Sequence, residues 1–513
     1  MTSTRSPLVF PRAAWWLLAF IPADVLVALD LERGVYRPTT WLARFVPAAL
    51  VLALVAWAEL TRTAVARRIR KELSLALPFG LPLLVVSGLA LLVDALPPAT
   101  LPGAMANGLV VPLSGLFAIA AVLLPFVTEL TSETWAALRT SPQGARALVE
   151  KFALAAALLL VAWLQLTCAH PSAEELAFGL ACFGVALTFS LGALRLLQHG
   201  LLAVVASLTL AMVLAGAVEL HHDWPVAASL VGLAAGALAL TSLLTVRSWW
   251  SQLPLVEAQP GSTTSAARWL SRVSWPWRAE LEPLRVALWL PLVGVAGTVL
   301  FAIDRADSSL ANAVAMPMFI GCASAALLSP AIVFSEARRA GTLELLLTVQ
   351  PAKTVFARKV SAAAAFAALS SVALPAAVST MSTQVSIDSL PWALAMAFLF
   401  AVGLVVALHA RQATVALFVA AAAAGALGIA QFVLAEGSAA FTHVLLHSGN
   451  PFDGLLDARH LAATFVGTTG LLLALAWWQF SDPRGGARKT ALGVGLCLAQ
   501  AVVIAVVGPL LPR

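Results

Sequence analysis

The sequence predicts an all-α fold, a polytopic transmembrane helix bundle, and three observations lead to this fold class. Hydrophobic residues make up 61% of the 513 positions and charged residues only 11%, whereas a soluble protein of this size is about a quarter charged. Nearly every window of roughly 20 residues is apolar enough to cross a bilayer. The apolar runs are continuous and rich in Ala and Leu, so they predict helices rather than strands.

In chain order, the apolar runs predict about fifteen spans, with about twelve as the lower bound. They lie at 13–29, 41–60, 75–94, 107–130, 152–169, 174–194, 200–219, 224–246, 286–303, 312–334, 360–380, 390–408, 412–434, 460–480 and 490–510. The first run is the weakest, because Asp24 interrupts it and Asp30 ends it.

The distribution of Lys and Arg predicts which side of the membrane each loop faces. With the N-terminus inside, all but six of the 31 Lys and Arg residues lie on the inner side or at its helix ends, as the positive-inside rule requires. The exceptions are Arg33, Arg37, Arg44, Arg305, Arg459 and Arg513. We therefore expect a multi-pass protein of a bacterial-type inner membrane with a cytoplasmic N-terminus. Anionic lipid explains the net charge of +6 without nucleic acid, and an acidic partner surface is the alternative.

Polar stretches between the runs divide the chain into five parts. Residues 1–71 contain two extra spans and a basic loop, and 72–246 form a first six-span unit. Residues 247–285 form a cytoplasmic interfacial linker, since Gly and Ser there favour flexibility and Trp interleaved with Arg suits the membrane surface. A second six-span unit covers 286–482, and 483–513 add one more span.

The most informative polar stretch is the insert from Ser335 to Lys359, between two long apolar runs. Gly341 is expected to let the chain turn out of the preceding span, and Thr342 to cap the helix that follows. Glu344 is expected in the first turn of that helix, and Pro351 to end it.

The insert therefore predicts a short amphipathic helix at the membrane surface. Leu343, Leu346 and Leu347 are expected on one face. Such a helix fits a groove on a soluble partner, or anchors the loop in lipid. The residues alone favour neither.

An insert at 131–142 in the first unit matches the insert from Ser335 to Lys359 and indicates an internal repeat. At a shift of 208 residues, Thr134, Leu138, Thr140 and Lys151 fall on Thr342, Leu346, Thr348 and Lys359. Chance similarity between Ala/Leu-rich segments is the alternative. It is weakened because the polar inserts are the parts that agree.

Motifs for chemistry are scarce. The stretch before Lys489 resembles the end of a P-loop but lacks the glycine before the lysine and leads into a span, so the chain is not expected to bind or hydrolyse ATP. The four cysteines lie singly in apolar runs without metal-ligand spacing, so no metal site, no other cofactor site and no enzymatic activity are expected. Asp24, Asp30 and Glu32 suit a polytopic membrane glycosyltransferase, which stays as one alternative function. A membrane scaffold that transports nothing is the other.

The insert from Ser335 to Lys359, in the second unit, resembles a segment of permeases of the type 2 class of ATP-binding-cassette (ABC-2) transporters. The likeness rests on Glu336, the run Gly341-Thr342-Leu343-Glu344-Leu345-Leu346, and Pro351 ahead of Lys359. In that family the segment is the coupling helix that contacts the ATPase subunit. The resemblance implies that these coupling residues are Glu336, Arg338, Arg339, Gly341, Thr342, Leu343, Glu344, Leu346 and Pro351.

The first insert departs from the family pattern, because Trp135 and Ala136 replace the Leu-Glu pair. A weaker second coupling segment is expected at Glu133, Thr134, Leu138, Arg139 and Pro142. The resemblance implies a double permease, a pseudo-dimer in one chain, that exports its substrate. ATP and Mg would be bound by separate cytoplasmic ATPase subunits.

Overall fold

The computed structural model divides the chain into two compact units, Met1–Pro260 and Gly261–Arg513, which are described here separately. The described residues are almost entirely helical and contain no strand, which confirms the all-α fold class. In the first unit they are 16, 38–61, 63–94, 116–127, 144–169, 190, 194 and 201–208. In the second unit they are 277, 280–304, 316–339, 341–381, 389–410, 412–447, 458–482 and 486–507.

The first unit is built on helices α3 (Pro38–Leu60), α4 (Ala64–Asp94) and α7 (Gly144–Ala169). A further helical stretch, 116–127, is almost wholly buried. These helices coincide with four of the predicted runs. The other predicted spans of this unit lie outside the described residues or are described only in part.

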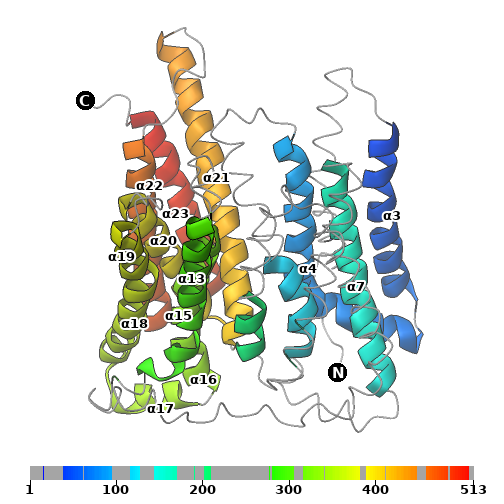
Figure 1. Ribbon diagram of the computed structural model, residues 1–513, viewed down its shortest axis with the longest axis horizontal. Coiled ribbons are helices and arrows are strands. Elements are labelled where there is room, and N and C mark those ends of the chain that lie inside the picture. Colours follow the sequence, from blue (N-terminus) through cyan, green and yellow to red (C-terminus); the bar gives the residue numbers. More distant parts are fainter. Residues whose placement is uncertain are drawn as a thin grey trace, which may run out of the picture. The chain divides into compact units, whose positions relative to one another are not determined.

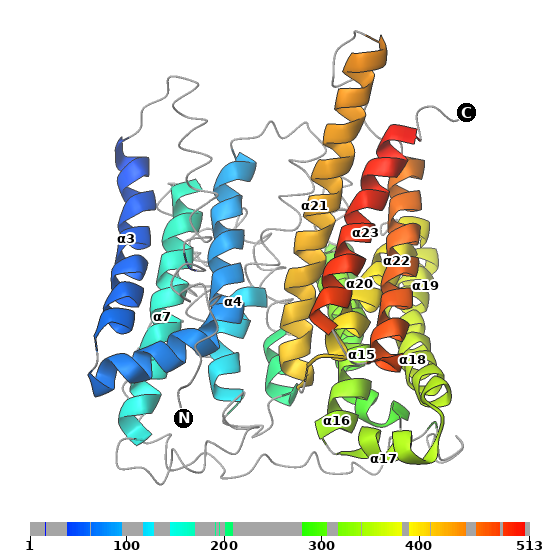
Figure 2. The same ribbon diagram turned by 180° about the vertical axis from the view of Figure 1, so that it is seen from behind.

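The basic stretch before 75–94, predicted as a loop, is instead the beginning of α4. Thr63 caps this helix, because its hydroxyl accepts a hydrogen bond from the Ala66 amide at 3.2 Å. Arg70 reaches back and donates to the Ala58 carbonyl at 2.6 Å, so it satisfies an end of α3. Figure 2 shows the start of α4 lying crosswise before the helix turns along α7.

The second unit is a bundle of long helices that run roughly parallel to one another (Figure 1). Its elements are η2 (Pro283–Val286), α13 (Trp289–Asp304), α15 (Met316–Ala331), η4 (Ile332–Glu336), α16 (Ala337–Arg339), α17 (Thr342–Val349), α18 (Ala352–Ala368), η5 (Leu369–Ala373), α19 (Leu374–Met381), α20 (Ser389–Ala407), α21 (Ala413–His447), α22 (Ala458–Ser481) and α23 (Gly486–Val507). Each of the seven runs predicted from 286 onward overlaps a helix.

Within the described part of the chain, five helical segments are long and apolar enough to cross a membrane. They are Met318–Ser335, Ala352–Ser379, Leu390–Ala407, Ala463–Ser481 and Arg488–Val506. Large apolar side chains on α22 and α23 remain exposed, among them Val466, Leu473, Leu492 and Val503. An apolar surface of this kind is rare in soluble monomers and is expected where helices face lipid.

Two of the spanning segments contain a π-helical turn. In η5 the Ser371 hydroxyl donates to the Cys322 carbonyl at 2.9 Å, and the Trp392 indole donates to the Ser371 carbonyl at 2.7 Å. Irregular backbone inside a membrane needs such partners, because no water is available there. The other π turn, η4, follows Pro330 and leads directly into the charged insert.

Close contact between α15 and α20 depends on Gly403. A Cβ atom at this position would lie 2.7 Å from the Leu327 carbonyl oxygen and 3.2 Å from Pro330. Small residues allow helix backbones to approach in this way, which is how helices pack in membranes.

We expect Gly403→Ala to lower the stability of the second unit by about 1–3 kcal/mol, because the backbone of α15 must move to admit the methyl group. The matched control is Gly428→Ala on α21, where a Cβ would meet nothing within 4 Å. Thermal unfolding of the chain in nanodiscs checks this expectation. Equal melting temperatures for the two variants would show that α15 and α20 are not closely packed.

Candidate functional site

The charged insert of the second unit folds into the short helices α16 and α17, which lie across one end of the bundle (Figures 1 and 2). The two helices meet at Gly341, whose backbone has φ 67° and ψ 4°, in the left-handed region. Glycine adopts this conformation without steric cost. The turn expected at Gly341 is therefore present, and it sets the direction of α17.

Thr342 does not cap α17 as the sequence suggested. Gly341 occupies the cap position, and the Thr342 hydroxyl donates backward to the Ala337 carbonyl at 3.0 Å. The left-handed glycine already sets the start of the helix, so the hydroxyl is used to close the end of α16. Glu344 does lie in the first turn of α17 and is exposed.

Pro351 separates α17 from α18. It has φ −58° and ψ 137° and follows the extended residue Gln350, so α17 ends at Val349, as predicted. Pro351 occupies the N-cap position of α18, and its carbonyl accepts the amides of Thr354 and Val355 at 2.9 and 3.2 Å.

The apolar face of α17 differs from the predicted one. Leu343 is buried, with 4% of its surface exposed, and Leu346 is half-buried. Leu343 therefore anchors the helix to its own unit. The exposed apolar side chains are Leu345 at 65% and Val349 at 75%, with Leu347 at 41%. Leu345 and Val349 were missed because all the leucines of this run look alike in sequence and only the packing of α17 shows which ones point outward.

Arg338 and Ser335 attach the start of the insert to the turn between α20 and α21. Arg338 donates to the Leu408 carbonyl at 2.6 Å and to the Ala410 carbonyl at 3.1 Å. Ser335 donates to the same Ala410 carbonyl at 3.3 Å. Arg338, predicted as a coupling residue, thus positions the insert. Glu336 lies on η4 and Arg339 on α16, but their side chains lie outside the described part.

Glu280 holds the other end of the insert. The Lys359 ammonium donates to Glu280 Oε2 at 2.8 Å and to the Val333 carbonyl at 3.3 Å. Arg358 lies 3.3 Å from Glu280 Oε1 and donates to the Gln350 side chain at 3.3 Å. The insert is therefore fastened on both sides, at η4 and at the start of α18.

An aromatic cluster supports these contacts. Phe334 directly precedes the insert and Phe356 lies near its end, in α18, and their ring centroids are 6.1 Å apart. Both rings pack against Phe480 of α22, at 6.0 and 5.0 Å, and Phe356 also meets Trp477 at 5.2 Å. Aromatic pairs at these distances are favourable beyond their buried area. Both ends of the insert are thus packed on the same spanning helix.

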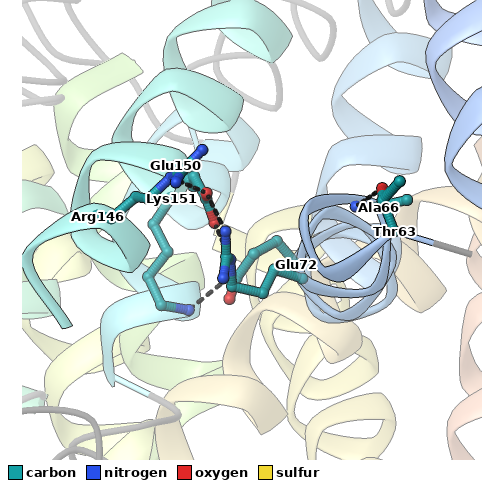
Figure 3. Close-up of polar contacts among 7 residues, drawn as sticks. Thr63, Ala66, Glu72, Arg146, Glu150 and Lys151 are labelled. Atoms are coloured by element: carbon teal, nitrogen blue, oxygen red, sulfur yellow. Dashed lines mark hydrogen bonds and ion pairs between the residues drawn. The ribbon is translucent and has the colours of Figure 1, made fainter. Parts of the chain in front are cut away.

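The corresponding insert of the first unit, with Glu133, Thr134, Leu138, Arg139 and Pro142, lies outside the described residues. The helix that follows it, α7, is described and carries charged contacts to α4 (Figure 3). Lys151 of α7 donates to Glu72 of α4 at 2.5 Å. Arg68 of α4 forms a two-pronged contact with Glu150 of α7, at 2.9 and 3.1 Å.

The arrangement at the second insert is suited to mechanical contact. Among the residues that the structure describes, no group of three His, Cys, Asp or Glu side chains could hold a metal ion. What the insert offers is a short, firmly held helix with an exposed apolar side and one exposed carboxylate. Comparisons with family models, curated proteins and solved structures gave no match.

We expect Gly341→Ala to speed hydrogen exchange of the α17 amides about 5- to 30-fold, because a Cβ in the left-handed region costs roughly 1–2 kcal/mol. Gly341→Asn should have a smaller effect, since Asn tolerates this region. Gly495→Ala is the control, because a Cβ there also meets nothing within 4 Å. Unchanged exchange in Gly341→Ala would mean that the turn is not required for α17.

Proposed function

We propose that this chain is the transmembrane permease subunit of an ATP-driven ABC-2-type transporter and that it supplies two permease units in one polypeptide. The observation that carries the proposal is the state of α17. This helix is fastened at both ends, yet it leaves Leu345 and Val349 uncovered. An uncovered apolar face on a firmly held helix is suited to a groove on a partner.

In the proposed mechanism, separate ATPase subunits bind α17, hydrolyse ATP with Mg, and move the insert. Movement of α17 reaches the bundle through two short routes. One passes through Arg338 to the turn between α20 and α21. The other passes through Lys359 to α18 and Glu280. The spanning helices then reorient to give alternating access, with export as the direction that the family resemblance favours.

The same proposal places α17 on the cytoplasmic side of a bacterial-type inner membrane. The bias of Lys and Arg toward the loops on this side of the predicted topology supports the assignment. Lys353 and Arg358 lie in the first two turns of α18, within the insert, and Lys489 lies in the first turn of α23. Trp477 and Trp478, near the end of α22, are typical of the membrane interface.

A lipid anchor is the competing interpretation of α17, since Leu345 and Val349 would also enter the interface of a bilayer. Glu344 argues for a protein partner, because it is exposed in the first turn of this helix and offers a charged contact beside the apolar ones. A glycosyltransferase would depend on Asp24, Asp30 and Glu32, which lie outside the described residues.

A photo-crosslinking amino acid at Leu345 tests the proposal. We expect ultraviolet light to join this position to a soluble ATP-hydrolysing protein in native membranes, with a yield that changes when vanadate and ATP are added. The control position is Leu492 on α23, which is 53% exposed on a spanning helix and should crosslink only lipid. Lipid adducts alone at Leu345 would establish the anchor and contradict the coupling role.

Replacing Leu345 with Asp should weaken the association with the ATPase at least about 30-fold, since a central apolar contact of an interface is worth about 2 kcal/mol or more. Leu492→Asp is not a suitable control because it would place a charge in the spanning part, so Ser481→Asp at the exposed end of α22, away from α17, is used. Co-purification followed by measurement of ATP hydrolysis checks this. Intact association in Leu345→Asp would remove this face from the interface.

A further inference from the structure

Two buried ion pairs occupy the same place in the two units. In the first unit Lys151 of α7 pairs with Glu72 at 2.5 Å, and in the second unit Lys359 of α18 pairs with Glu280 at 2.8 Å. Each pair joins residues that are 79 positions apart in the sequence. Glu280 lies 208 residues after Glu72, and Lys359 lies 208 residues after Lys151.

The helices that carry the two lysines also begin in the same register. α7 starts at Gly144 and α18 at Ala352, again 208 residues apart. The shift was defined by three residues of each insert and by the lysines. It did not involve Glu72 or Glu280, so their agreement is an independent observation.

Both pairs are almost completely removed from solvent. The side chains of Lys151 and Glu72 are 0% and 7% exposed, and those of Lys359 and Glu280 are 3% and 8% exposed. A buried ion pair contributes little to net stability compared with an apolar pair of the same shape, because both charges must lose their water. Its best-attested contribution is to fix one arrangement of the chain among several.

We propose that Glu72–Lys151 and Glu280–Lys359 are equivalent positioning pairs, one in each unit, that fix the helix after each insert to the segment that leads into the unit's first span. This inference rests on the proposed function and extends it. If both units hold the helix after the insert in the same way, both transmit movement to their bundles, although only the second insert resembles the coupling segment.

The contacts of the second pair show what is positioned. Lys359 also donates to the Val333 carbonyl, in the π turn before the insert. It therefore joins the chain before the insert, the chain after it, and the segment that ends in η2. In the first unit the glutamate lies within α4, and Figure 3 shows Lys151 extending from α7 toward Glu72. Each lysine thus holds together segments that are far apart in sequence.

Hydrogen exchange on the full-length chain in nanodiscs tests positioning without any partner. We expect Lys359→Met to speed exchange of the α17 amides at least about tenfold relative to those of α22, because local opening free energies set these rates. We expect Lys151→Met to do the same for the second turn of α7, where the amides are hydrogen-bonded, relative to α3. Lys359→Arg keeps the charge and should stay within about twofold of the natural chain.

The matched controls are lysine and arginine side chains in ion pairs of the same units. Lys489→Met removes a partner of Asp482, whose side chain is 53% exposed, and Arg146→Met removes a 65% exposed partner of Glu150. Neither should alter exchange at α17 or in the second turn of α7. Equal effects of the control and test variants would overturn the proposal.

A stability role is separated from positioning by the double variant Glu280→Gln/Lys359→Met. It removes both charges of the pair and leaves an amide oxygen facing Arg358, so it should keep the melting temperature, but it cannot donate to the Val333 carbonyl. We expect faster exchange of α17 in a chain that still melts at the natural temperature. Natural exchange in this variant would show that the ion pair merely fills space and would overturn the proposal.

The equivalence of the two units is tested by ATP hydrolysis in membranes that contain the chain and the ATPase found by crosslinking at Leu345. Lys151→Met and Lys359→Met should each lower transport-coupled hydrolysis at least about fivefold, as residues on one coupled route do. Loss in Lys359→Met alone would overturn the equivalence. If no ATPase depends on the chain, the proposed function fails, while the exchange measurements still decide whether the pairs position the helices.

Discussion

The ammonium group of Lys359 joins α18 to Glu280 and to the Val333 carbonyl of η4, and the structure around the insert depends on these contacts. Placing a lysine at the centre of a bilayer costs roughly 2.5–3.5 kcal/mol, so α18 cannot slide along the membrane normal. Burying the same group within the protein requires an opposite charge, which Glu280 supplies at 2.8 Å. Because Lys359 also binds the Val333 carbonyl, the start of α18 and the end of the preceding span occupy one fixed arrangement.

The shape of the insert follows from this arrangement. A chain that must leave η4 and enter α18 within the 15 residues 337–351 needs two sharp changes of direction, and Gly341 and Pro351 make them. Leu343 then fills the space beneath α17, while Leu345 and Val349 point away from the unit. The exposed apolar side is a consequence of how the helix is fastened, and it is the part of the unit that a partner could bind without opening the bundle.

Much of the fold could be predicted from the sequence, since a bilayer requires long apolar runs and excludes charge from them. The runs at 390–408 and 460–480 lie within one or two residues of α20 and α22. What could not be predicted depends on contacts between distant segments. The outward direction of Leu345 and the use of Arg338 to bind carbonyls of a turn 70 residues later follow from packing. Glu72 and Glu280 are related by the same 208-residue shift as the inserts, so the sequence held a signal for them, but only the structure shows that each faces a lysine 79 residues later.

The neighbours of the two lysines differ, and this difference argues against strict symmetry. The residue before Lys359 is Arg358, which adds a second cation at Glu280. The residue before Lys151 is Glu150, which faces Arg68 and Arg146 instead. Both units thus keep one buried Glu–Lys pair and rearrange the charges around it. Arg358 also binds Gln350 at the end of α17, so in the second unit the insert is tied to the pair. A pair that is kept while the charges beside it differ is what two units would have if the pair itself, and not its neighbours, fixes the arrangement of the helices.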